Sequence, residues 1–276
     1  MKSDVIIIGG GAAGSFAAIT AARMGRTVTL FEKNEKIGRK LRITGKGRCN
    51  VTNNCTWQEA MNSVPVNPRF LYSAFSGFQP QDVMNFFEEL GVPLKTERGN
   101  RVFPVSDKAE DIVDALDREM KSLGVKVIHQ RAAKIIVDGN VCTGVIAGGK
   151  EYYSQSVLIA TGGQSYPKTG STGDGYKLAE SVGHTVTPIY PSLVPLVSVE
   201  KYCGEMMGLS LKNVGVRLYD KEKIIFSEQG EMLFTHFGVS GPLILSASSH
   251  IRKMERGRYK IKIDLKPALD IKQLDL

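Results

Sequence analysis

The chain has 276 residues, of which 42% are hydrophobic and 23% are charged, and its formal net charge is +8. This balance excludes a disordered or low-complexity protein, and no apolar stretch is long enough to span a bilayer. We therefore expect a globular, cytoplasmic protein with no membrane partner.

The first 32 residues predict a βαβ unit. Residues 4–8 are an apolar, β-branched run typical of a buried strand, and three glycines interrupt it at 9–11. Residues 12–24 then predict an alanine-rich helix, and residues 27–31 predict a second buried strand that ends at Glu32. Because a single helix joins the two strands, we expect them to be parallel.

The glycines of this unit match the dinucleotide fingerprint Gly-x-Gly-x-x-Gly at Gly9, Gly11 and Gly14. The first permits a tight turn, the second lets the backbone approach a diphosphate, and the third lets the helix lie close to the sheet. The helix N-terminus, at Ala12 and Ala13, offers unpaired amides to that diphosphate. These residues predict a nucleotide site.

Glu32 and the segment after it favour FAD. A carboxylate at the end of the second strand accepts hydrogen bonds from ribose and repels a ribose phosphate, so FAD or NAD is expected rather than NADP. The chain has no second fingerprint, and residues 37–54 form a long, basic, glycine-rich loop. Such a loop can place donors along a diphosphate and a flavin. The candidate cofactor residues of the loop are Gly38, Arg39, Lys40, Thr44, Gly45, Gly47, Arg48, Cys49 and Asn50. Lys33, directly after Glu32, is a further candidate.

The middle of the chain predicts alternating helices and strands. Ser106 is the expected N-cap of the helix predicted over 108–123. The expected helices span 68–76, 81–90 and 108–123, and the expected strands span 101–105, 125–129, 133–137, 142–147, 151–153 and 156–160. The last strand is expected to be buried and ends in glycines, which places Thr161 and Gly162 at the cofactor edge of the sheet.

Two further residues of this region are assigned to the cofactor site, Ala132 and Asp174. Asp174 precedes an expected helix over 176–182, and two roles remain open for it. It either binds cofactor hydroxyls or caps that helix.

The sequence pattern changes near residue 188, where three prolines lie close together, and the segments after them predict mainly strands. We expect an FAD-binding domain over 1–188 and a β-rich domain over 189–276. Residues 266–276 give no sign of closing a fold. The expected strands of this second region span 193–199, 209–219, 223–227 and 259–265.

The side chains most often used in catalysis give weak signals. Four cysteines, at 49, 55, 142 and 203, have neither Cys-x-x-Cys nor zinc-type spacing, so we expect reduced thiols and no metal. A redox disulfide between Cys49 and Cys55 stays open as an alternative. His236 is the one catalytic candidate, either as a substrate-facing proton donor or as a packed side chain.

Several motifs carry a resemblance to a known family. They are Gly-Gly-Gly-Ala-Ala-Gly at 9–14, Gly-Arg-Lys-Leu at 38–41, and the blocks at 44–53, 101–106, 160–175 and 233–242. In these the chain resembles the bacterial BaiN-type (YhiN-type) NAD(P)/FAD-dependent oxidoreductases, some of which are named aminoacetone oxidase-like. The resemblance implies a glutathione-reductase-like, Rossmann-type α/β FAD domain that carries an inserted, mostly β domain.

The resemblance also implies a longer protein. Members of that family return after the insert to complete the flavin half of the site, so we expect this chain to look truncated at its C-terminus. We expect the flavin end of its site to be incomplete and its affinity for FAD to be reduced.

The expected function is FAD-dependent electron transfer between a small organic substrate and NAD(P)H or dioxygen, with any NAD(P)H bound only transiently. Family naming suggests unsaturated steroid-like acids or an amino ketone as substrates. Two alternatives remain open. One is an RNA-associated flavoprotein, which the basic segments 33–48 and 252–262 permit, although nucleic acid is not the expected partner. The other is a non-catalytic nucleotide-binding fragment. The sequence leaves the oligomeric state open.

Overall fold

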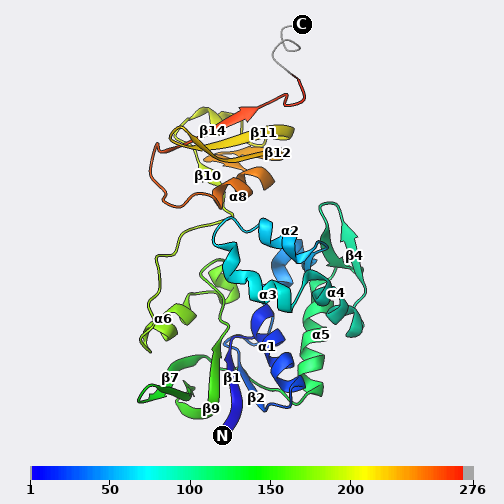
Figure 1. Ribbon diagram of the computed structural model, residues 1–276, viewed down its shortest axis with the longest axis vertical. Helices are drawn as coiled ribbons and strands as arrows, with labels where there is room; N and C mark the ends of the chain where they lie inside the picture. Colours follow the sequence, from blue (N-terminus) through cyan, green and yellow to red (C-terminus); the bar gives the residue numbers. More distant parts are fainter. Residues whose placement is uncertain (1, 270–276) are drawn as a thin grey trace. The chain divides into compact units, whose positions relative to one another are not determined.

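The computed structural model describes residues 2–269, and the chain divides into two compact units (Figure 1). Unit 1 comprises Met1–Ser63 and Arg69–Thr187, and unit 2 comprises Val64–Pro68 and Pro188–Leu276. Among residues 2–269, no helix is both long and apolar enough to cross a membrane.

Unit 1 is built on a six-stranded sheet in the order β6-β2-β1-β9-β8-β7. β1 lies between β2 and β9 and is parallel to both, so the expected parallel βαβ unit is confirmed. The outer strands β8 and β7 continue the sheet in antiparallel pairing. The bounds are β1 (Lys2–Ile8), β2 (Val28–Phe31), β6 (Lys126–Ile128), β7 (Ala132–Asp138), β8 (Val141–Ala147) and β9 (Lys150–Ile159).

Two helices cover one face of this sheet and pack against each other, α1 (Ala12–Arg23) and α5 (Ala109–Ser122) (Figure 1). The apolar positions of α5 recur at helical spacing, and the buried ones join the core beneath α1, as the sequence predicts. The expected cap is wrong. Lys108 is the N-cap residue, and the Ser106 hydroxyl accepts a hydrogen bond from the Lys108 N–H instead.

The strand expected over 156–160 is not a separate element. β9 runs without a break from Lys150 to Ile159 and includes both the strand expected over 151–153 and the strand expected over 156–160. Its polar stretch needs no turn, because β9 pairs with β8 on one side and β1 on the other. The expected burial is also incomplete, since Leu158 is 42% exposed.

A three-stranded sheet and five short helical segments follow β2 along the chain of unit 1. The expected helices over 68–76 and 81–90 are confirmed as η2 with α3 and as α4. The segment 37–54 contains two short elements where a loop was expected, η1 and β3. The bounds are η1 (Leu41–Gly47), β3 (Thr52–Asn53), α2 (Trp57–Asn62), η2 (Pro68–Leu71), α3 (Tyr72–Gly77), α4 (Pro80–Glu89), β4 (Leu94–Glu97) and β5 (Arg101–Pro104). After β9 follow η3 (Pro167–Thr169) and α6 (Asp174–Glu180).

Unit 2 is a five-stranded sheet in the order β10-β13-β12-β11-β14, with α8 packed on one face. The expected strands are present, but β12 is longer than predicted and β10 is much shorter. Its apolar core joins the sheet to α8. The bounds are β10 (Leu196–Val197), α7 (Tyr202–Glu205), β11 (Ser210–Asp220), β12 (Lys223–Thr235), β13 (Gly238–Ser240), α8 (Pro242–Ser248) and β14 (Tyr259–Asp264). The expectation for 266–276 lies largely outside the described residues.

Candidate functional site

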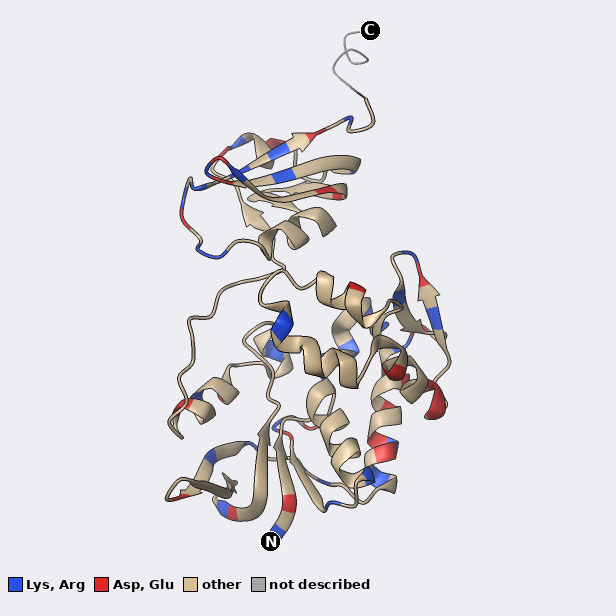
Figure 2. Ribbon diagram, in the orientation of Figure 1, with Lys and Arg blue, Asp and Glu red and all other residues tan. Residues whose placement is uncertain are grey.

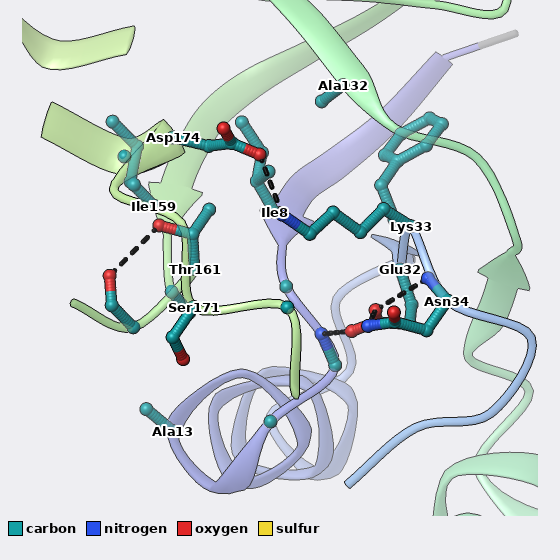
Figure 3. A pocket seen from close by; sticks show the side chains of 18 of the residues that line it. Ile8, Ala13, Glu32, Lys33, Asn34, Ala132, Ile159, Thr161, Ser171 and Asp174 are labelled. Atoms are coloured by element: carbon teal, nitrogen blue, oxygen red, sulfur yellow. Dashed lines mark hydrogen bonds and ion pairs between the residues drawn. The ribbon is translucent and has the colours of Figure 1, made fainter. Parts of the chain in front are cut away.

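Unit 1 contains a cavity of about 610 Å³ beside the carboxyl ends of β1, β2 and β9 (Figure 3). Small-molecule sites typically measure about 300–1,000 Å³, and in open α/β sheets they lie at this edge. The cavity brings together thirteen of the predicted cofactor residues. They are Gly9, Gly11, Ala12, Ala13, Glu32, Lys33, Gly38, Arg39, Lys40, Ala132, Thr161, Gly162 and Asp174.

The three fingerprint glycines have different surroundings. Gly9 has a φ of +110°, and a Cβ atom added to it would lie 2.5 Å from the carbonyl oxygen of Ala160. A Cβ atom on Gly14 would overlap the carbonyl oxygen of Gly9. A Cβ atom on Gly11 would meet nothing within 4 Å. The chain's own packing therefore requires glycine at 9 and 14, whereas at 11 it leaves open space in the cavity.

Glu32 ends β2 and is only 7% exposed. Its Oε2 accepts a hydrogen bond from the Gly10 N–H at 2.8 Å, and its Oε1 accepts from the Asn34 N–H at 2.8 Å and from Asn34 Nδ2 at 2.6 Å. Figure 3 shows this carboxylate between the glycine turn and Asn34. These three hydrogen bonds fix the Glu32 side chain at the cavity edge before any ligand binds.

Asp174 is held by two cations from different parts of the fold. Its Oδ2 lies 2.9 Å from Lys33 Nζ, and its Oδ1 lies 2.9 Å from Arg131 Nη2. Burial alone would raise the pKa of the Asp174 carboxyl, but the hydrogen bonds from Lys33 and Arg131 outweigh it and hold that pKa below its ordinary value. The alternative role as a helix cap is wrong, because Gly173, with a left-handed φ of +77°, is the N-cap residue of α6.

Arg39 and Lys40 are the other two cations of the lining. Arg39 Nη1 donates to Asn34 Oδ1 at 3.1 Å, and Lys40 Nζ donates to the Ser165 carbonyl oxygen at 2.9 Å. Both belong to the start of the segment 37–54, which the sequence assigned to a diphosphate.

The second half of that segment turns away from the cavity. Arg48 Nη1 lies 2.9 Å from Glu97 Oε1 and 3.2 Å from Asp107 Oδ1, and its guanidinium carbon lies 4.0 Å from the centre of the Phe103 ring. These contacts bind the segment to the three-stranded sheet. The predicted cofactor residues that do not line the cavity are Gly14, Thr44, Gly45, Gly47, Arg48, Cys49 and Asn50.

The turn before Cys49 has an unusual backbone. Gly45, Lys46, Gly47 and Cys49 all have a positive φ, which is uncommon for the lysine and the cysteine. Cys49 is only 2% exposed, and burial raises the pKa of its thiol. All four cysteines are free thiols in this structure. Cys49 therefore packs in the core of unit 1.

His236 lies in unit 2, in the turn between β12 and β13. Its exposed ring meets the ring of Phe237 edge-on, with 4.9 Å between the ring centres. Its role as a proton donor stays a prediction.

The sequence missed several residues of the cavity wall, among them Asn34, Gln130 and Arg131. Asn34 lies two residues after Glu32 and was within reach of sequence reasoning. Arg131 adjoins the predicted Ala132, but nothing in the sequence connects it to Asp174, 43 positions later.

Comparison with known proteins gives matches over most of the chain. Residues 3–255 match the family described as HI0933-like protein, Rossmann domain. A 3-dehydro-bile acid delta(4,6)-reductase of Clostridium scindens is 33% identical over 97% of this chain and 66% of its own length. A ribosomal RNA dihydrouridine synthase of Haemophilus influenzae is 32% identical over 98% of this chain and 66% of its own length. The chain thus spans just under two thirds of these relatives.

Among solved structures, the open conformation of a flavocytochrome c3 fumarate reductase superposes with a TM-score of 0.52. It is 20% identical and covers 77% of this chain and 47% of its own. Together with the family match, this confirms the predicted Rossmann-type, glutathione-reductase-like α/β fold.

Proposed function

The chain belongs to the family of HI0933-like proteins with a Rossmann domain, and from that premise we propose that it is an FAD-dependent oxidoreductase. One observation carries this proposal. The open space at Gly11 faces the cavity at the N-terminus of α1, with a buried carboxylate, Glu32, at the end of the next strand. That combination fits a diphosphate and a ribose of one dinucleotide.

The residues present fit the adenosine half of FAD. The amides at the start of α1 and the cations Arg39 and Lys40 would hold the diphosphate, because both present positive charge to the cavity. Glu32 would bind the ribose through Oε2, which accepts only one hydrogen bond, from Gly10, whereas Oε1 accepts two from Asn34. FMN has no adenosine, so these residues favour FAD over FMN.

When bound, FAD would supply hydride transfer between NAD(P)H and a small organic substrate, with dioxygen as the alternative partner for electrons. The chain's own residues bind and orient it. In this proposal, residues 1–188 are the FAD-binding domain and 189–276 are the inserted, β-rich domain. NAD(P)H binds only transiently.

The names of the two relatives suggest a class of substrate. One names a reductase of the delta(4,6) double bonds of a 3-dehydro-bile acid, and the other names the synthesis of dihydrouridine. Both names describe the addition of two hydrogens across a ring carbon–carbon double bond. We propose the same reaction class here, in which NAD(P)H supplies the hydride and a proton completes the reduced bond.

A displacement titration tests the cofactor assignment. FAD fluorescence is followed as the purified protein is added, and ADP or FMN then competes. ADP should displace FAD because it fills the adenosine half, whereas FMN should not. Displacement by FMN alone would overturn the assignment. An assay of NADH or NADPH oxidation with a cyclic enone then tests the reaction. FAD binding without any such oxidation would leave the non-catalytic, nucleotide-binding alternative.

A second candidate substrate is RNA. Two curated relatives, from Haemophilus influenzae and Escherichia coli, bear the name ribosomal RNA dihydrouridine synthase. On unit 2, Arg217 of β11 stands directly opposite Lys262 of β14, and like charges in that position repel unless an anion is bound. Figure 2 shows Lys and Arg along both strands. Filter binding of ribosomal RNA across a salt series tests this candidate, because phosphate contacts weaken steeply with salt. Salt-independent retention, or none, would contradict it.

A further inference from the structure

Four charged side chains line the cavity near the carboxyl end of β2. They are Glu32, the adjacent Lys33, Arg131 between β6 and β7, and Asp174 at the start of α6. Two are carboxylates and two are cations, so their formal charges cancel. In the proposed function this end holds the adenosine ribose, and the inference below rests on that assignment.

Asp174 holds both cations. Its side chain is 13% exposed and lies 2.9 Å from each of Lys33 Nζ and Arg131 Nη2. A second contact from Arg131 Nε to Oδ2, at 3.2 Å, makes that pair bidentate. Lys33 Nζ also donates to Thr172 Oγ1 at 2.7 Å. Figure 3 shows the Lys33–Asp174 ion pair among the side chains that line the cavity.

This arrangement withholds the cations that a ribose phosphate requires. Sites for 2′-phosphorylated dinucleotides use a cation close to the ribose, commonly an arginine. Here Lys33 and Arg131 line the cavity, but Asp174 pairs with both of them, and the negative charge of Glu32 brings the net charge of the four side chains to zero. The remaining lining cations, Arg39 and Lys40, contact Asn34 and Ser165 instead.

We propose that Asp174 sets the ribose specificity of the site: it occupies Lys33 and Arg131 and so keeps the adenosine end for nucleotides without a 2′-phosphate. The chemistry gives a reason. NADPH contains a 2′-phosphorylated ADP moiety, so an enzyme that takes electrons from NAD(P)H must keep this donor out of the place of its FAD. Because Asp174 occupies both cations and Glu32 offsets the remaining positive charge, a 2′-phosphate gains little attraction there, and the cavity need not be narrow.

The test compares ADP-ribose with its 2′-phosphate, each displacing FAD from the protein. These two ligands differ only in the phosphate. The wild-type protein should prefer ADP-ribose by at least about tenfold, since a single close charge contact is worth this much. Asp174→Asn should raise the absolute affinity for the phosphorylated ligand by about tenfold, because it frees both cations. The double variant Lys33→Gln/Asp174→Asn should lose much of that gain.

Matched variants keep the experiment decisive. Arg131→Gln alters an exposed side chain, so the fold should tolerate it even where Asp174→Asn fails, and it should make the phosphorylated ligand bind more weakly still. Asp117→Asn on α5 removes an ion pair with Lys121. Neither residue lines the cavity, so this control should leave the preference unchanged.

Three outcomes would count against the inference. Unchanged affinity for the phosphorylated ligand in folded Asp174→Asn would overturn it. A fall in affinity for ADP-ribose with no gain for its phosphate would assign Asp174 to the ribose hydroxyls instead. Failure of the wild-type protein to bind either ligand would overturn the cavity assignment itself, and the proposed function with it.

Discussion

The carboxylate of Glu32 accepts a hydrogen bond from the backbone N–H of Gly10, with 2.8 Å between the two atoms. This bond joins the end of β2 to the glycine turn after β1. The acid and the glycines of the fingerprint are thus parts of one structure rather than two separate ligand contacts. Substitution of the acid should disturb the turn as well as the proposed contact with the ribose.

Glu32→Gln should lower both stability and affinity for FAD. The new amide has one oxygen in place of two, so its nitrogen faces either the Gly10 N–H or the two donors of Asn34. Leaving buried donors unpaired should reduce the free energy of unfolding by about 1–3 kcal/mol. Urea titration measures this, with exposed Glu35→Gln as the control. Equal stability of the two variants would show that the carboxylate does not organise the turn.

Gly11 and Gly14 should separate cofactor binding from folding. Gly11→Val places its side chain in the open space of the cavity, so stability should change by no more than about 0.5 kcal/mol while FAD binding is lost. Gly14→Ala drives a methyl group into the carbonyl oxygen of Gly9, and we expect a loss of about 1–3 kcal/mol or more. Thermal melts and FAD titration distinguish the two effects. Normal FAD binding by a folded Gly11→Val protein would reject the diphosphate position.

The Arg48 ion pairs should make stability depend on acid pH. Hydrogen bonding to Arg48 lowers the pKa of Glu97, and hydrogen bonding to Lys95 lowers that of Asp107. A carboxyl whose folded pKa is lowered stabilises the protein above its ordinary pKa, and this contribution is lost as the pH falls through the folded value. Arg48→Met should therefore flatten the loss of stability below the ordinary pKa values of 4.5 and 3.8.

Melting temperatures measured across that acid range test the effect. Arg98→Met is the matched control, because Arg98 is exposed in the turn after β4 and its side chain lies outside this group of ion pairs. Parallel profiles for wild-type and Arg48→Met proteins would mean that these surface pairs contribute nothing measurable, which is common for exposed pairs.

The cysteines should differ in their reaction with iodoacetamide. Cys49 is 2% exposed and burial raises the pKa of its thiol, so at pH 8 it should remain unmodified until urea unfolds the protein. Cys55 is only partly buried and should react in the folded state. Peptide mass spectrometry measures the extent of modification at Cys49 and at Cys55. A Cys49–Cys55 disulfide in protein purified without reductant would revive the redox alternative.

The sequence predicted the parts of the fold that short-range patterns determine. The first strand, α1 and β2 follow from an apolar run, three glycines and an alanine-rich helix within some thirty residues. β9 was predicted as two strands, over 151–153 and 156–160, whereas its continuity depends on pairing with β1, about 150 positions away. α8 was not predicted, although Pro242 fits the first turn of a helix.

The candidate site, like the fold, could be predicted only where its residues lie close together in the sequence. Gly9, Gly11 and Glu32 lie in one motif, and their positions relative to one another follow from the βαβ geometry. The ion pair of Lys33 with Asp174 joins residues 141 positions apart, so only the folded chain reveals it. Arg48 was assigned to the cofactor by its neighbours in the sequence, but its acidic partners Glu97 and Asp107 come from elements whose placement no local pattern gives.

The pairing of β1 with β9 determines when this protein can fold during its own synthesis. Lys2 pairs with Tyr153, and the Ala160 N–H closes the cavity wall by bonding to the Ile8 carbonyl oxygen. At about 5–20 residues per second, a ribosome needs roughly 8–30 s to reach that point. During this time the apolar strand at the N-terminus has one edge without its native neighbour, which is the period when a nascent chain is most prone to aggregate. A cofactor present at synthesis cannot shorten this interval, because its cradle is assembled only when the interval ends.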